Sequence, residues 1–236
     1  MFSNWSKSSY YTYLFGLLSI TALSILAHVT IIGLIGAIFG FTSVVLIVNK
    51  KKQAGYVGMV SAVIYAVVSY GLGNYSDALL NVLFILFLNI PLILNRNYQN
   101  GKKPKTIKGN YGLLAELLIL WITIFITLFI TEIDVFNAPR PFWSVLAASF
   151  GIIASISTSF FMLKESFWIW SFQNILQVLL FGITLYQTKS GIALLMMVTY
   201  IFYTINATTA FFNGKWYEKQ LEKEKYENIW IVLKKS

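Results

Sequence analysis

Eight long hydrophobic stretches, separated by short polar segments, run through the chain. Most of them approach the roughly 20 residues that a helix needs to cross the hydrocarbon core of a bilayer, although the first is shorter. A backbone inside lipid must satisfy its own hydrogen bonds, so such stretches are expected to be helices. The pattern therefore predicts an all-α integral membrane protein with eight transmembrane helices. The predicted spans are residues 10–26, 27–48, 54–72, 76–95, 111–131, 141–163, 165–185 and 190–211.

The basic residues in the polar segments indicate an orientation. When eight spans are threaded through a bilayer, all of the 18 Lys and Arg residues except Arg140 and Lys189 fall on one side. Because Lys and Arg accumulate in cytoplasmic loops, we expect a multi-pass protein of the cell membrane with both termini in the cytoplasm. The net charge of +9 then reflects topology, and we expect the lipid bilayer but no nucleic acid as a partner.

Composition narrows the possible chemistry. The chain has no cysteine and a single histidine, His28, which excludes thiolate and multi-histidine metal sites. No nucleophile stands beside a base in the pattern, and a membrane-embedded hydrolase needs such groups within hydrogen-bonding reach. We therefore expect no cofactor, no metal and no enzymatic activity. A membrane-embedded enzyme and a scaffold that transports nothing are the alternatives from other functional classes.

The longest polar segment, residues 95–110, holds five basic residues and no acidic ones, and it separates the first four spans from the last four. A thin similarity at an offset of 112 residues places Lys52 on Lys164 and Tyr65 on Gln177. It predicts a parallel 3+1+3 repeat, with chance likeness between apolar spans as the alternative. The predicted parts are an N-terminal segment with an extra helix (1–26), a first three-helix repeat (27–95), a basic loop with a linker helix (96–140), a second three-helix repeat (141–211) and a cytoplasmic tail (212–236).

Amide side chains at membrane depth form the clearest candidate binding face. In the seventh and eighth spans, polar and aromatic residues recur at helical spacings of three, four and seven, so each span presents them on one face. Such amides can also join helices without any ligand, which is the alternative. The candidates are Trp170, Gln173, Asn174 and Gln177 in the seventh span, Thr199, Tyr203 and Asn206 in the eighth, and Asn81 and Asn89 of the fourth span on the opposite side.

This set of side chains indicates the kind of solute. Carboxamides donate and accept hydrogen bonds, and aromatic faces accommodate a flat or cationic ring. No Lys or Arg is expected at membrane depth to neutralise a phosphate. Asp77 is expected at an outer span end, and only Glu116 lies well inside a span. The pattern thus predicts facilitated diffusion of an unphosphorylated heterocycle with a sugar-like arm, and proton coupling through Glu116 is the alternative.

Several of these features together resemble the PnuC-type vitamin transporters, over about residues 27–216. They are the eight spans, the basic loops, the segment Phe167-Trp-Ile-Trp170 followed by Gln173 and Asn174, and the stretch Tyr75–Asn81. The resemblance implies a 3+1+3 core like that of the SWEET sugar carriers and assembly as a homotrimer. It further implies facilitated diffusion of nicotinamide riboside or a related solute, which phosphorylation then traps inside the cell. Relatives carry thiamine, riboflavin and deoxyribonucleosides.

The sequence departs from that family at two places. The family has a Trp-x-x-Trp pair where this chain has Phe167 and Trp170, with an additional Trp168, and we include these three among the candidate substrate-binding residues. The fourth span is apolar over Val82–Leu88, where the family has aromatic and Gln-rich sequence. Phenylalanine at position 167 attracts a cationic ring more weakly than tryptophan would, while the amide side chains are kept. This combination favours a neutral nucleoside such as a deoxyribonucleoside over nicotinamide riboside. Another ring-containing vitamin such as thiamine is the alternative.

Overall fold

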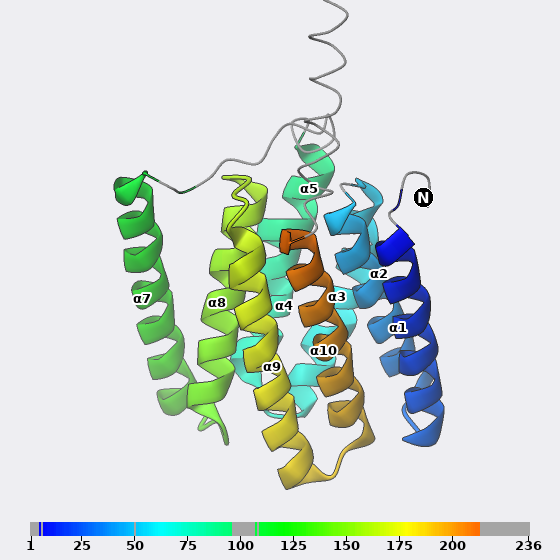
Figure 1. Cartoon of the computed structure of the whole chain (residues 1–236). Helices are drawn as coiled ribbons and strands as arrows, with labels where there is room; N and C mark the ends of the chain where they lie inside the picture. Colours follow the sequence, from blue (N-terminus) through cyan, green and yellow to red (C-terminus); the bar gives the residue numbers. More distant parts are fainter. Residues whose placement is uncertain (1–4, 6, 50, 96–106, 108, 213–236) are drawn as a thin grey trace, which may run out of the picture.

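The computed structural model describes residues 5, 7–49, 51–95, 107 and 109–212, and in this part of the chain it is helical (Figure 1). Eight of its helical stretches are long and apolar enough to cross a membrane, as predicted. The predicted cytoplasmic tail beyond residue 212 and most of the basic loop lie outside the described residues. The helices are α1 (Lys7–Leu26), α2 (Ile31–Val48), α3 (Gln53–Gly71), α4 (Tyr75–Phe84), the π-helix η1 (Ile85–Asn89), α5 (Ile90–Leu94), α7 (Tyr111–Asp134), α8 (Pro141–Ser159), α9 (Ser166–Thr188) and α10 (Gly191–Phe212).

Local sequence explains where several helices begin and end. The Asn110 side chain accepts a hydrogen bond from the Leu113 N–H at 3.1 Å and so caps α7. Pro141 occupies the first turn of α8, where its missing N–H costs nothing. Lys189 takes a left-handed conformation (φ 55°) just after α9, which ends that helix. The sixth span is shorter than predicted, because α8 ends at Ser159 and not at residue 163.

The connections between helices define two ends of the molecule. One end, here called the basic end, carries the α2–α3 turn with Lys51 and Lys52, the start of α7, and the α8–α9 connection with Lys164. It is uppermost in Figure 1. The opposite end carries the α1–α2, α3–α4, α7–α8 and α9–α10 connections. The described basic residues thus divide between the two ends as the sequence pattern predicts.

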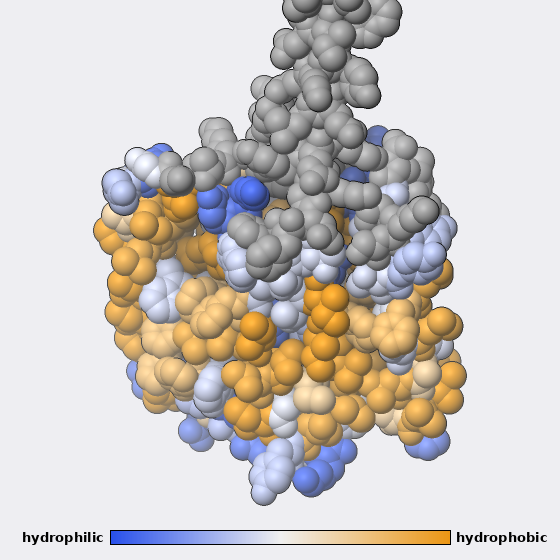
Figure 2. Space-filling model, viewed as in Figure 1, coloured by the Kyte–Doolittle hydropathy of each residue, from blue (hydrophilic) through white to orange (hydrophobic). Residues whose placement is uncertain are grey.

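Two groups of three helices meet at the centre. In the first, α3 packs against both α2 and α4, and in the second, α9 packs against both α8 and α10. The groups contact each other through α4 with α8 and α2 with α10, while α7 lies on α8 and α1 lies on α2 and α10. The 3+1+3 repeat, which needs such equivalent contacts, stays a prediction. Figure 2 shows a hydrophobic band around the middle of the visible face, with hydrophilic residues towards its ends, as a lipid-facing surface requires.

The fourth span is interrupted by a π-helical turn, and this turn sets the direction of its amides. In a regular α-helix, eight residues rotate by about 800°, which would leave Asn89 about 80° away from Asn81. A π-bulge accommodates one additional residue, so the offset falls to about 20°. Asn81 and Asn89 therefore lie on one face, and both side chains are buried.

Candidate functional site

A cavity lies between the two helix groups, in the half of the molecule nearer the basic end. The space between its lining atoms is about 720 Å³, a figure that includes open solvent. Its walls come from the second halves of α2 and α10, the first halves of α3 and α9, and the centre of the fourth span. In each of these four helices, the half that lines the cavity is the half nearer the basic end. The cavity is therefore confined to one side of the molecule.

Most of the predicted site residues lie in the lining of this one cavity. The seventh, eighth and fourth spans each contribute, as the helical spacing predicted. A binding role for them stays a prediction, because the geometry shows only that they share a surface. The predicted residues that line the cavity are Asn81, Asn89, Phe167, Trp170, Gln173, Asn174, Tyr203 and Asn206.

Three predicted residues lie outside the lining. Trp168 is two residues from Trp170 and so points about 200° away, where it is 46% exposed. Gln177 and Thr199 are buried on the predicted faces, but each lies one turn closer to the opposite end. Gln177 donates a hydrogen bond to Asp77, and the Thr199 hydroxyl donates to the Leu195 carbonyl at 2.8 Å. The Thr199 hydroxyl and the Gln177 amide nitrogen are therefore engaged within the protein, whereas the Gln177 oxygen has no partner in the described chain.

Gln173 is the most informative polar group of the cavity. Its side chain is fully buried, yet neither its amide nitrogen nor its oxygen has a hydrogen-bond partner among the described residues. Gly151 of α8 makes room beside it for Leu80, since a Cβ there would lie 2.8 Å from the Leu80 methyl groups and in ordinary contact, at 3.4 Å, with Gln173 Cγ. Because buried amides are almost always hydrogen-bonded, an unpaired one that lines a cavity indicates a place for a polar ligand.

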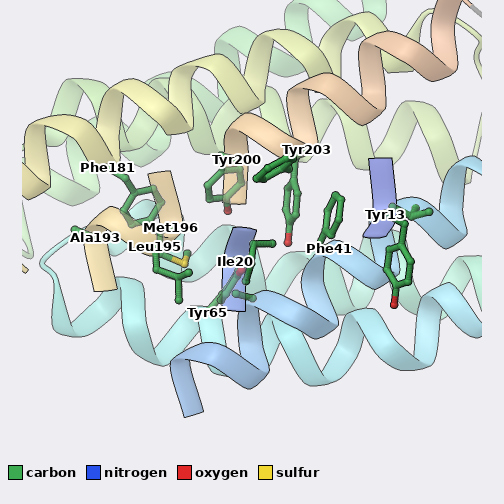
Figure 3. Close-up of a cluster of buried hydrophobic side chains, with 13 residues drawn as sticks. Tyr13, Ile20, Phe41, Tyr65, Phe181, Ala193, Leu195, Met196, Tyr200 and Tyr203 are labelled. Carbon is green, nitrogen blue, oxygen red and sulfur yellow. The ribbon is translucent and has the colours of Figure 1, made fainter. Parts of the chain in front are cut away.

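Two tyrosine hydroxyls approach the same region above Gly40. A Cβ at Gly40 would collide with the Tyr203 hydroxyl and lie 3.4 Å from that of Tyr65. Neither hydroxyl makes a hydrogen bond of standard geometry to the described residues. The Tyr203 ring is held by Phe41, stacked with centroids 6.3 Å apart, and by Tyr200, edge-on at 5.1 Å (Figure 3). These rings fix the hydroxyl at the wall of the cavity.

Three further lining residues, Trp170, Asn81 and Asn206, donate their side-chain N–H groups to partners within the protein. Trp170 donates its indole N–H to the Thr158 hydroxyl at 2.9 Å, which fixes the plane of its ring. The Trp170 ring lies 5.5 Å from Phe84 with an angle of 51° between the planes. Asn81 and Asn206 donate to backbone carbonyls at 2.8 and 3.3 Å. The sequence pattern did not single out Phe84, whose only signal is its place one turn after Asn81.

No charged side chain lines the cavity among the described residues. In the same part of the chain, no cluster of three His, Asp or Glu residues could hold a metal ion. Glu116, the acid that the sequence pattern singled out, is exposed on α7, and α7 contributes nothing to the cavity. The chemistry of the site therefore consists of hydrogen bonds and aromatic contacts.

Asp77 lies near the span end where the sequence pattern placed it, in the first turn of α4. Its side chain is fully buried there. Its carboxylate accepts hydrogen bonds from the Ser69 hydroxyl, at 2.5 Å, and from the Gln177 amide. Asp77 lies one turn before Asn81, on the same helical face. This spacing places Asp77 just beyond the cavity lining, on the side nearer the opposite end of the molecule.

Comparison with known proteins agrees with this architecture. A sequence profile of the family described as "Nicotinamide mononucleotide transporter" matches residues 30–218. The solved structure described as "Crystal structure of the Vitamin B3 transporter PnuC" is similar to this fold, with a TM-score of 0.76. The two share 18% sequence identity over 92% of this chain and 95% of that chain, which shows a common fold. No curated protein matches the sequence.

The matched residues include every helix that lines the cavity, and only α1 and the last residues of the chain lie outside them. The resemblance to the PnuC-type transporters is thereby confirmed. Both the family and the solved structure are described as transporters. With eight membrane-spanning helices around a cavity of amide and aromatic side chains, the chain belongs to the nicotinamide mononucleotide transporter family.

Proposed function

We propose that this protein carries an unphosphorylated, nucleoside-like solute across the cell membrane by facilitated diffusion. The observation that supports this most directly is the Gln173 carboxamide, fully buried at the cavity with both polar atoms unpaired in the described chain. Leaving a buried polar group unsatisfied costs about 1–3 kcal/mol, which a bound solute would recover. Sugar hydroxyls and the edge of a heterocyclic base offer the donors and acceptors that a carboxamide needs.

The electrostatics of the cavity favour a nucleoside over a nucleotide. The family description names a mononucleotide, and the solved relative is described as a vitamin B3 transporter. A phosphate group in a membrane protein needs Arg or Lys partners, and the described cavity lining contains none. A deoxyribonucleoside or ribonucleoside, or nicotinamide riboside, would enter without an uncompensated negative charge.

The aromatic lining favours a neutral ring. A cationic ring is held best by tryptophan. The described lining of this cavity contains one tryptophan, Trp170, and it has Phe167 where the family pair has its first tryptophan. A neutral base needs only a flat apolar face, which Trp170 and Phe84 both supply. We therefore place a neutral nucleoside first and nicotinamide riboside second.

The absence of charge from the described lining also supports transport without ion coupling. The solute would move down its own gradient and be trapped inside the cell by phosphorylation. In this proposal the basic end faces the cytoplasm, and the protein assembles as a homotrimer, as the family resemblance implies. Thiamine transport coupled to protons through Glu116 gains no support, because Glu116 is exposed and distant from the cavity lining.

Thermal unfolding of the purified protein tests the substrate class. A ligand that binds only the folded state raises the melting temperature. We expect thymidine or nicotinamide riboside to raise it, whereas the corresponding monophosphates and thiamine leave it unchanged. Counterflow of the active compound into proteoliposomes should then proceed without any imposed ion gradient. Stabilisation by a nucleotide but not by its nucleoside would contradict the proposal.

Replacing Trp170 with alanine should weaken solute binding by about 1–3 kcal/mol, the range seen when a base loses its aromatic stacking partner. Trp168→Ala serves as the matched control, because it removes the same side chain from the opposite face of the same helix. Isothermal titration of both variants with the stabilising solute measures the difference. Equal affinity in the two variants would show that Trp170 does not contact the solute.

A further inference from the structure

Beyond the cavity, towards the opposite end, polar contacts join the same helices that line it. Beside the cavity, α9 and the fourth span contribute Gln173, whose amide is unpaired in the described chain, and Asn81. Further along, Gln177 donates to Asp77, and Asn74 donates to the Thr184 hydroxyl at 3.3 Å. The face of α9 that lines the cavity thus continues as a bonded seam with the start of α4.

Arg140 completes this seam at the opposite end. Its Nε donates to Asn74 at 3.0 Å, its Nη1 donates to Gln187 of α9, and its Nη2 donates to the Leu72 carbonyl at the end of α3. The side chain is only 6% exposed although it carries a charge. Burial lowers the pKa of the Arg140 guanidinium, and the nearby Glu132 carboxylate opposes this effect. Arg140, the residue just before α8, therefore joins the end of α3, the start of α4 and the end of α9.

The seam is long and has an apolar counterpart. From Gln177 to Gln187 it follows ten residues of α9, about 15 Å, which is about half the thickness of a bilayer core. On the α10 side, Phe181 of this stretch stacks on Tyr200 at 5.7 Å, within the hydrophobic cluster of Figure 3. The described polar and apolar contacts together separate the cavity from the opposite end.

We propose that Arg140 is a positioning residue of transport that holds the opposite end of the solute path closed, and that its hydrogen bonds to Asn74, Gln187 and Leu72 must break before solute reaches the cavity from that side. This inference rests on the proposed transport function. Alternating access requires the two helix groups to separate at one end while they stay together at the other. The hydrogen bonds of Arg140 cross this division, from α3 and α4 to α9.

The natural absence of cysteine allows a direct test. Ala62 lines the cavity and is small, so Ala62→Cys places one thiol there. A membrane-impermeant, charged methanethiosulfonate reagent is then applied to each side of oriented vesicles. We expect rapid labelling from the basic end and slow labelling from the opposite end. Adding Arg140→Gln should raise the rate from the opposite end about tenfold or more, because a buried charged hydrogen-bond donor is lost.

Three further variants separate gating from general loosening. Arg140→Lys keeps the charge but not the forked donors, so its rate should lie between those of the parent and Arg140→Gln. Lys189→Gln removes the other basic residue of this end, which lies over the Tyr186 ring and joins no helices in the seam, and should change nothing. Gln187→Ala removes an exposed partner of Arg140 and should raise the rate by a smaller factor even if Arg140→Gln does not fold.

Two results would overturn the inference. One is an unchanged rate from the opposite end in both Arg140→Gln and Gln187→Ala. The other is an equal rise from both ends, or an equal rise in Lys189→Gln, since either shows loosening of the whole fold. The labelling needs no transported solute, so a wrong substrate class leaves this test intact.

Discussion

Gln173→Leu should abolish detectable solute binding while the protein without solute becomes no less stable. Leucine is close to glutamine in volume and brings no polar atoms, so it removes two buried groups that have no partner in the described chain. Removing an unsatisfied buried polar group is neutral or stabilising, whereas a site built to hydrogen-bond its ligand loses much of its affinity. We expect binding to weaken by about 2–4 kcal/mol and the melting temperature to stay level or rise.

Gln177→Leu is the matched control, one turn further along the same helix. The Gln177 amide donates to Asp77, so leucine leaves a buried carboxylate with one donor fewer. This variant should lose about 1–3 kcal/mol of folding stability. Thermal unfolding and titration with the stabilising solute compare the two variants. If Gln173→Leu destabilises the protein as much as Gln177→Leu does, the Gln173 amide is a structural link and not a ligand group.

The sequence predicts the membrane architecture well because lipid imposes a simple rule on it. Span length follows bilayer thickness, and the Lys and Arg distribution follows the side of the membrane, so both are visible without tertiary contacts. The amide face of α9 is likewise visible, because Trp170, Gln173 and Asn174 follow the regular spacing of one helix. Their convergence with Tyr203 depends only on α9 and α10 packing with these faces inward, which the polar residues already require.

Other parts of the site depend on geometry that a regular helix does not contain. Asn81 and Asn89 share a face through the π-helical turn, and eight residues of ideal α-helix would have separated them. Trp168 stands between the two motif positions Phe167 and Trp170 in sequence but lies on the other side of the helix. Asp77 stands near the end of its span, as the sequence pattern placed it, but its side chain is fully buried. Its burial results from Ser69 and Gln177 on two other helices, and no local pattern indicates such partners.

Asp77→Leu should destabilise the protein strongly, whereas Asp77→Asn should fold and transport. Leucine leaves the Ser69 hydroxyl and the Gln177 amide of the seam without their acceptor, at about 2–5 kcal/mol in total. Asparagine keeps one oxygen for a donor and presents an NH₂ group in place of the other. The Gln177 oxygen has no partner in the described chain, so rotation of that amide would let it accept from the new NH₂ group.

The same Asp77→Asn variant tests ion coupling, because asparagine cannot carry a proton. Asp77 is the buried acid nearest the cavity lining in the described chain, and its two oxygens already accept hydrogen bonds, as an ionised carboxylate does. We expect proteoliposomes with the parent protein to equilibrate the solute and not to concentrate it when a proton gradient is imposed. Asp77→Asn and Glu116→Gln should then exchange solute at similar rates. Accumulation against the solute gradient that is lost only in Asp77→Asn would make Asp77 a proton carrier and replace facilitated diffusion with coupled transport.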